Sequence, residues 1–315
     1  MKIYHAISPR SPRPPLIVGI GAFDGVHRGH RAVLAAVRRL AGAKGRAGVI
    51  TFGAHPRRVV GAGGGESLTT LAQRRELFRA AGIDVCWLLE FDRRFSLLSP
   101  EAFVRGALER KLRVAGVCVG EGFRFGRGRE GTVASLRRMG ADFGFRVREV
   151  PAVRVDGRRV SSTRIRSLLA RGDVRAAAKN LGRDYVLTGT VGAGARRGRS
   201  LGYPTANFIP EQMSPRPGVY AVSISVGRLR RPGMLYLGRR PTPAGNWSGE
   251  LGAEANLFGF TGNLYGRRIK VFLKNRLRSD IKFKTMAALL RQIRRDEIRA
   301  RFSGGSLSRR KGECV

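Results

Sequence analysis

A strand, turn and helix pattern near the N-terminus constrains this chain more than any other feature. Leu16 to Ile20 is an apolar run suited to a buried strand, and Arg31 to Leu40 carries apolar residues at helical spacing. The turn between them is rich in glycine and contains His27 and His30. Because free N–H groups at a helix start attract anions, imidazoles placed there suit a nucleotide phosphate.

The two histidines also have simpler interpretations, as ordinary loop residues or as metal ligands. The histidines are concentrated in the first segment of the chain, where His55 follows the next apolar run, Ala47 to Phe52. Ligands of parallel sheets bind beyond the carboxyl ends of the strands. Imidazoles that follow successive strands therefore favour a chemical role.

The turn sequence Gly-Ala-Phe-Asp-Gly-Val-His-Arg-Gly-His, residues 21–30, resembles a known signature. It is similar to the HxGH motif of nucleotidyltransferases that attach AMP to a phosphate, in the form found in bacterial bifunctional FAD synthetases. The resemblance implies that His27 and His30 line the ATP triphosphate. It also implies nucleotide contacts from Gly21, Phe23, Asp24 and Gly25.

A hydroxyl-rich segment further along supports the same family. Ser161-Ser162-Thr163 can cap a helix, whose arginines would then face a phosphate. The segment resembles the superfamily motif Ser-Ser-Thr-x-x-Arg. That resemblance implies nucleotide binding by Ser161, Ser162 and Thr163, and a catalytic role for Arg166.

The loop 120–126, Gly-Glu-Gly-Phe-Arg-Phe-Gly, resembles the family loop that follows the fourth strand. The resemblance assigns Phe123 and Phe125 to the flavin, although the phenylalanines are equally well interpreted as core residues. His55 lies in a second match to the family, Thr-Phe, two residues and then His-Pro at 51–56, and is assigned to the flavin as well. Gly122 stands where the family has a polar residue. This departure predicts weakened, but not abolished, use of FMN.

Strands and helices alternate through the first half of the chain. This rhythm predicts an α/β fold with a doubly wound parallel sheet, the Rossmann-like arrangement of the nucleotidyltransferases. Thr70 to Gln73 reads as a capping box, and Asp156-Gly157 as a hairpin turn. The expected strands are residues 16–20, 47–52, 85–91, 114–120 and 145–150, and helices are expected from Thr70 to Ala81 and from Ser99.

The pattern changes beyond Arg183, where apolar alternation as in Tyr220 to Val226 replaces the strand and helix rhythm. Several short strands and a final helix over about 285–302 predict a small antiparallel β-barrel closed by a C-terminal helix. We expect a nucleotidyltransferase domain at 1–183, a kinase domain at 184–302 and a disordered tail at 303–315.

The segment 198–207 is the second diagnostic stretch. Glycines allow backbone N–H groups to approach phosphates, and Thr and Asn oxygens suit Mg²⁺. The segment resembles the riboflavin kinase signature Gly-Arg-x-x-Gly-x-Pro-Thr-Ala-Asn. The resemblance implies nucleotide binding by Gly198, Arg199 and Gly202, and Mg²⁺ binding by Thr205 and Asn207.

Glu254 matches the catalytic carboxylate of the kinase family and is the expected general base. Without the neighbouring Pro-Thr-Ala-Asn motif, the simpler interpretation of Glu254 would be a solvated carboxylate on a strand. Arg278 lies in a segment resembling the family's flavin contact. Three family positions differ, because Tyr236 replaces a common Asn, and Asn256 and Gly259 replace a common His and Asp.

The composition of the chain indicates its partners, its location and the state of its cysteines. The chain has 315 residues, 42% of them hydrophobic, and a formal net charge of +39. Arginine is spread over almost every segment, so we expect non-specific, salt-sensitive binding to polyanions and no specific nucleic-acid partner. With no apolar run long enough for a membrane span and no secretory signal, we expect a cytoplasmic protein, a monomer or weak homo-oligomer. Cys86 and Cys118 read as buried thiols.

The motifs together predict a bifunctional enzyme that uses ATP and Mg²⁺. The second half would phosphorylate riboflavin to FMN, and the first would transfer AMP from ATP to FMN, forming FAD. One alternative is a riboflavin kinase with a weak or inactive adenylyltransferase domain. The other is a basic RNA-binding or flavin-responsive regulator without turnover.

Overall fold

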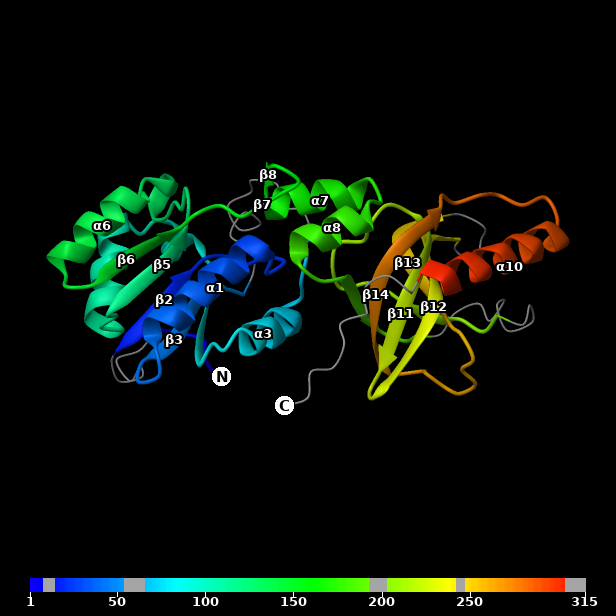
Figure 1. Ribbon diagram of the computed structural model, residues 1–315, viewed down its shortest axis with the longest axis horizontal. Helices are drawn as coiled ribbons and strands as arrows, with labels where there is room; N and C mark the ends of the chain where they lie inside the picture. Colours follow the sequence, from blue (N-terminus) through cyan, green and yellow to red (C-terminus); the bar gives the residue numbers. More distant parts are fainter. Residues whose placement is uncertain (8–14, 54–65, 193–202, 242–246, 304–315) are drawn as a thin grey trace. The chain divides into compact units, whose positions relative to one another are not determined.

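The computed structural model describes residues 1–7, 15–53, 66–192, 203–241 and 247–303. The chain divides into two compact units, Met1–Ser162 and Thr163–Val315 (Figure 1). The helix α7 (Ser162–Ala170) begins at the last residue of the first unit and continues in the second, where α8 (Val174–Leu181) follows it. The domain boundary expected at residue 183 stays a prediction.

A six-stranded parallel sheet forms the centre of the first unit, in the order β1-β4-β3-β2-β5-β6. This confirms the doubly wound parallel sheet. The strands are β1 (Lys2–Tyr4), β2 (Leu16–Ile20), β3 (Arg46–Phe52), β4 (Val85–Leu89), β5 (Gly116–Gly120) and β6 (Arg146–Val150). The chain order reverses between β2 and β5. The loops after these two strands therefore flank the point where such sheets bind ligands.

Two layers of helices cover this sheet. Leu34 of α1 (Arg28–Ala41) and Phe78 of α3 (Leu71–Ala80) pack in one core cluster, and Leu136 of α6 (Val133–Asp142) packs in the cluster on the other face. The residues of β2 alternate between the clusters, with Val18 on the α6 side and Ile17 on the α1 side, as expected for a strand buried on both faces.

Several local predictions for the first unit are confirmed. Thr70 and Gln73 form the expected capping box at the start of α3. Asp156 and Gly157 turn the short hairpin between β7 (Arg154–Val155) and β8 (Arg158–Arg159) with φ of 50° and 71°. The buried thiols are confirmed as well, with Cys86 1% and Cys118 0% exposed.

The structure adds elements that the sequence pattern did not predict. The three-residue strand β1 pairs with β4 at the sheet edge. The helix expected from Ser99 consists of α5 (Pro100–Phe103) continued by a π-helical segment, η1 (Val104–Lys111). Two further short helices, α4 (Arg93–Ser96) and the 3₁₀ turn η2 (Arg127–Arg129), lie in connections.

An antiparallel sheet in the order β10-β13-β12-β11-β14-β9 forms the second unit. Its strands are β9 (Tyr185–Thr190), β10 (Ala206–Phe208), β11 (Gly218–Val226), β12 (Leu229–Pro241), β13 (Trp247–Leu257) and β14 (Arg268–Arg278). Gly192 N–H donates to Asn207 O at 2.8 Å, joining the two edge strands and curling the sheet into a barrel.

The final helix α10 (Met286–Ser303) packs against β11, β12 and β14, as predicted (Figure 1). Ala221 and Met234 face this helix and cluster with its Ala300. Tyr220 and Leu235, one position along, point to the other face and are fully buried. In the described part of the chain, no helix has both the length and the apolar character needed to cross a membrane.

Candidate functional site

The turn after β2 places His27 and His30 together at the start of α1. His27 is the N-cap of this helix, and its Nδ1 accepts the backbone N–H of His30 at 3.2 Å. The two imidazole rings stack with centroids 3.6 Å apart. A Cβ on Gly29 would lie 3.2 Å from the His27 ring, so glycine at this position leaves room for the stack. The predicted position of the two histidines at a helix start is confirmed, whereas their contact with a phosphate stays a prediction.

The other residues of this turn that were predicted to bind the nucleotide make contacts within the fold around the turn. Phe23 is buried and meets the His30 ring edge to face, with centroids 5.2 Å apart. Asp24 is also buried, and its carboxylate accepts the backbone N–H groups of Leu68 and Thr69. Gly21 and Gly25 lie in the same turn. Nucleotide contacts by these four residues stay a prediction.

A hydrogen bond joins the hydroxyl-rich motif to this turn. Ser162 Oγ donates to Asp24 O at 2.9 Å, within the first unit, and Ser161 precedes it. Thr163 and Arg166 follow on α7, in the second unit. The roles of these residues in nucleotide binding and catalysis stay a prediction.

The loop after β5 contains the two phenylalanines assigned to the flavin. Phe123 and Phe125 stack with centroids 5.6 Å apart, and Phe125 also packs on Phe103 in the core. Gly122 has a φ of 71°, the left-handed conformation that glycine adopts without strain. A polar residue at 122 must therefore adopt a positive φ.

Sequence reasoning missed a buried arginine beneath the turn. Arg74, on α3, is 6% exposed and donates to three backbone carbonyls, those of Ala22, Phe52 and Gly53, at 2.9–3.1 Å. It lies among exposed charged residues in the sequence, and no local pattern distinguishes it from its neighbour Arg75. Burial lowers the pKa of its guanidinium, and the nearby charge of Asp24 raises it.

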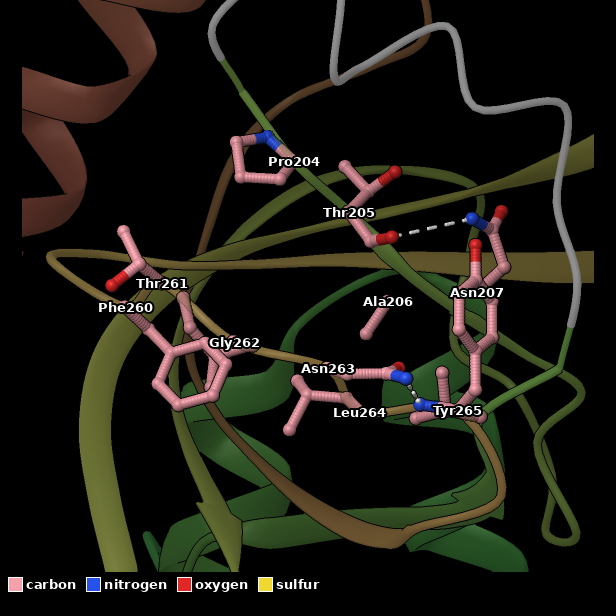
Figure 2. A pocket seen from close by; sticks show the side chains of 12 residues that line it. Pro204, Thr205, Ala206, Asn207, Phe260, Thr261, Gly262, Asn263, Leu264 and Tyr265 are labelled. Carbon is pink, nitrogen blue, oxygen red and sulfur yellow. Dashed lines mark hydrogen bonds between the residues drawn. The ribbon is translucent and has the colours of Figure 1, made fainter.

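In the second unit, a pocket of about 710 Å³ opens beside the predicted metal ligands (Figure 2). Thr205 and Asn207 line it together with the segment 260–265. In Figure 2 the Asn207 amide nitrogen turns toward Thr205 O, to which it donates at 3.5 Å, while Phe260 and Thr261 lie on the other side. The pocket is lined by polar oxygens and by apolar side chains, which include Val191 and Leu257.

Glu254 does not line this pocket but stands beside it. It pairs directly with Asn207 across β10 and β13, and with Tyr236 across β13 and β12. Directly opposed residues of antiparallel strands project from the same face. These paired residues form a row across the sheet. The row continues from Tyr236 to Val219 on β11 and from Val219 to Arg278 on β14. The fold thus brings Asn207, Glu254 and Arg278 to one face of the sheet.

Arg278 and Tyr236 are both fixed by carboxylates. Arg278 Nε donates to Asp296 on α10 at 2.7 Å, in an ion pair that is almost fully buried. Tyr236 Oη donates to Asp280 at 3.0 Å. Burial, followed by the charge of Asp280, raises the pKa of the Tyr236 phenol. The phenol therefore remains a neutral donor.

The replaced family position Asn256 has a structural role that the sequence did not reveal. It is 8% exposed, and its Nδ2 donates to Pro204 O at 2.8 Å. The bond ties β13 to the residue before Thr205. Of the other predicted site residues, His55, Gly198, Arg199 and Gly202 lie outside the described residues. Of the tail expected at 303–315, Ser303 instead ends α10, and residues 304–315 lie outside the described residues.

Comparison with known proteins finds a matching family model for each half of the chain. Residues 10–164 match the family model described as FAD synthetase, and residues 181–303 match the model described as riboflavin kinase. A protein of Escherichia coli K12 named bifunctional riboflavin kinase/FMN adenylyltransferase is 36% identical over 300 residues, covering 93% of this chain and 94% of its own length. A protein of the same name from Pseudomonas fluorescens is 37% identical, covering 90% of this chain and 92% of its own.

A solved structure also resembles the chain along its length. The crystal structure named Macrolide-efflux Protein from Streptococcus pneumoniae has a TM-score of 0.85 and 27% identity, and it covers 96% of this chain and 99% of that chain. Its fold therefore matches both units.

Proposed function

The chain belongs to the family of bifunctional riboflavin kinase/FMN adenylyltransferases, and we propose that the two groups of residues described above carry its two reactions. The second unit phosphorylates riboflavin to FMN with ATP. The first adenylylates FMN to FAD with a second ATP and releases pyrophosphate. The family assignment favours this function over a regulator without turnover.

In the kinase reaction, Glu254 acts as general base. Its carboxylate takes the proton of the ribityl 5′-hydroxyl while that oxygen attacks the γ-phosphorus of ATP, and ADP leaves. The observation that supports this role is the direct pairing of Glu254 with Asn207, beside a pocket lined by Thr205. Arg278, held by Asp296, lies in the same row and would bind the flavin.

The donor set around Thr205 fits Mg²⁺. The ion takes hard oxygen ligands and usually keeps only one or two from the protein, the rest coming from phosphates and water. Thr205 and Asn207 offer a hydroxyl and an amide oxygen at the pocket wall. Among the described residues, no cluster of three or more His, Cys, Asp or Glu could hold a metal alone, so ATP phosphates would complete the site. Bound Mg²⁺ would neutralise phosphate charge.

In the adenylylation reaction, the first unit supplies position and charge. A phosphate oxygen of FMN attacks the α-phosphorus of ATP, and pyrophosphate leaves without a covalent protein intermediate. His30 and the backbone N–H groups at the start of α1 stabilise the charge on the phosphates. His27 caps the helix through Nδ1, which holds the His30 backbone in place.

Product analysis tests this proposal. The purified protein is incubated with riboflavin, ATP and Mg²⁺, and riboflavin, FMN and FAD are separated by chromatography. We expect FMN to appear first and FAD to follow, and removal of Mg²⁺ by a chelator to stop both. FMN without any FAD, even at saturating FMN, would support the kinase with an inactive first unit. No product at all would contradict the proposal.

Location and assembly stay predictions. We propose a cytoplasmic enzyme that acts on small molecules as a monomer or weak homo-oligomer, with only non-specific affinity for polyanions from its +39 charge.

A further inference from the structure

The turn that carries the two histidines contains strained backbone. Phe23 has a φ of 50° and the β-branched Val26 a φ of 37°. Such conformations are unfavourable for residues with a side chain, above all β-branched ones, and persist only where the surroundings fix them. The turn therefore needs support from outside the signature itself.

The segment before α3 supplies the first part of this support. Asp24 accepts the backbone N–H of Leu68 at 2.9 Å and that of Thr69 at 3.3 Å. The Thr69 hydroxyl accepts the Gly25 N–H at 3.0 Å and lies 3.4 Å from Asp24 Oδ1. These residues are buried, so the hydrogen bonds are shielded from water. The bonds fix the backbone between the two strained residues.

Arg74, in the first turn of α3, supplies the second part of the support. Nη1 of the guanidinium donates to both Ala22 O and Phe52 O, and Nη2 donates to Gly53 O. These carbonyls lie at the end of β3 or just beyond the ends of β2 and β3. Thr51 Oγ1 also donates to Ala22 O at 3.1 Å. A buried guanidinium is tolerated only when it is hydrogen-bonded, and here its bonds join the two strand ends.

The Arg74 guanidinium donates to backbone carbonyls at the edge where ligands of such sheets bind. These bonds hold the backbone of the turn in place. Adenylyl transfer depends on alignment, and a displacement of about 1 Å can cost about 10²-fold in rate.

We propose that Thr69 and Arg74 form a brace that holds the turn 22–30 in the geometry required for AMP transfer. Both are positioning residues, and they act through the backbone of the turn. This inference rests on the proposed adenylyltransferase function of the first unit.

Matched substitutions test the brace. Thr69→Val removes the hydroxyl at nearly constant shape, and Thr69→Ser keeps it. Arg74→Lys keeps the charge but cannot reach three carbonyls from one nitrogen. Arg75→Lys makes the same change at the exposed neighbouring position. FAD formation from FMN and ATP is followed at steady state, with riboflavin phosphorylation by the second unit as the internal control.

We expect Thr69→Val and Arg74→Lys to lower kcat for FAD formation by about 10-fold or more, with KM for ATP and FMN changed by less than about 3-fold. Thr69→Ser and Arg75→Lys should stay within about 2-fold of the parent, and riboflavin phosphorylation should not change. Parental kcat in both test variants would overturn the brace. So would a loss of activity that merely equals the loss of folded protein, measured by circular dichroism.

Amide hydrogen exchange separates this inference from the proposed function. In Thr69→Val, peptides covering residues 22–30 should exchange at least about 10-fold faster than in the parent, and in Thr69→Ser they should not. A parental protein that makes no FAD would contradict the proposed function, and the exchange result would then decide the brace alone. Unchanged exchange in Thr69→Val would overturn it.

Discussion

Glu254 lies directly opposite Asn207 where β13 pairs with β10, so the expected general base and an expected metal ligand project from the same face of the barrel sheet. The two residues are far apart in sequence. The strand register therefore brings the two candidate kinase residues together, and riboflavin phosphorylation should be sensitive to either side chain alone.

Substitution of Glu254 by Gln should lower riboflavin phosphorylation by at least ~10²-fold, because the amide cannot accept the proton from the ribityl hydroxyl. Adenylylation of supplied FMN should not change, since it belongs to the first unit. Both activities are measured on the same preparation. Glu211→Gln is the control, because this substitution removes an equal charge from the same unit. Glu211 forms its ion pair with the exposed Arg268. A near-parental rate in Glu254→Gln would show that Glu254 is not the base.

Substitution of His30 by Ala should have the converse effect. A lost donor to developing phosphate charge costs on the order of 2–4 kcal/mol in preorganised sites. The backbone N–H of residue 30 still reaches His27 Nδ1, so the helix start should survive. FMN should accumulate from riboflavin without conversion to FAD. His5→Ala, at an exposed position outside the site, should behave as the parent. Equal FAD formation by His30→Ala and the parent would count against the assignment.

Local features of the fold were readable from the sequence, because each depends on adjacent residues. The Thr70 and Gln73 capping box, the Asp156-Gly157 turn and the helix start at His27 are such features. The strand β1 was not readable, since three residues without alternation become a strand only by pairing with β4.

The candidate site was predictable as a set of residue types but not as an arrangement. Motif resemblance supplied His27, Thr205 and Glu254, whereas the register that aligns Glu254 with Asn207 follows from long-range pairing. Arg74 could not be predicted, because an arginine on a polar helix is normally exposed, and only tertiary packing buries it.

Tyr236→Phe should weaken riboflavin binding. The lost hydroxyl donates to Asp280, in the segment expected to contact the flavin, and without this bond the segment is held less firmly. A hydrogen bond to a charged group contributes about 1.5–3 kcal/mol, and less where the carboxylate is exposed. We expect KM for riboflavin to rise by about 5-fold, with kcat changed by less than about 2-fold. An unchanged KM would mean that the bond does not position the flavin segment.

The buried thiols should make the protein less stable at high pH. Burial raises the pKa of Cys86 and of Cys118 from 9.0 to about 11 in the folded protein. The neutral thiols are thus favoured by folding, and their contribution is fully present below pH 9 and is lost as the pH rises through about 11. Urea unfolding at pH 8 and pH 10 should show a smaller pH-dependent loss for a Cys86→Ala/Cys118→Ala variant than for the parent. Equal losses would contradict the assignment.

The last prediction concerns Gly122, which takes the place of a polar family residue. A residue other than glycine fits this position without strain only where φ is negative, and φ here is 71°. Asn tolerates the left-handed conformation better than most residues. A Cβ at 122 would lie 3.8 Å from the Arg159 guanidinium, so an Asp side chain would turn to that charge instead of the flavin. We therefore expect Gly122→Asn, and not Gly122→Asp, to raise FAD formation at limiting FMN.

Gly122→Ala is the control for strain, because it adds a Cβ at the same φ without a polar group and should lower stability by about 1 kcal/mol without improving the use of FMN. KM for FMN is measured for all three variants and the parent, with riboflavin phosphorylation as the internal reference. A folded Gly122→Asn variant with parental KM for FMN would mean that another group already orients the acceptor. A lower KM in Gly122→Ala as well would assign the effect to loop rigidity and not to the polar side chain.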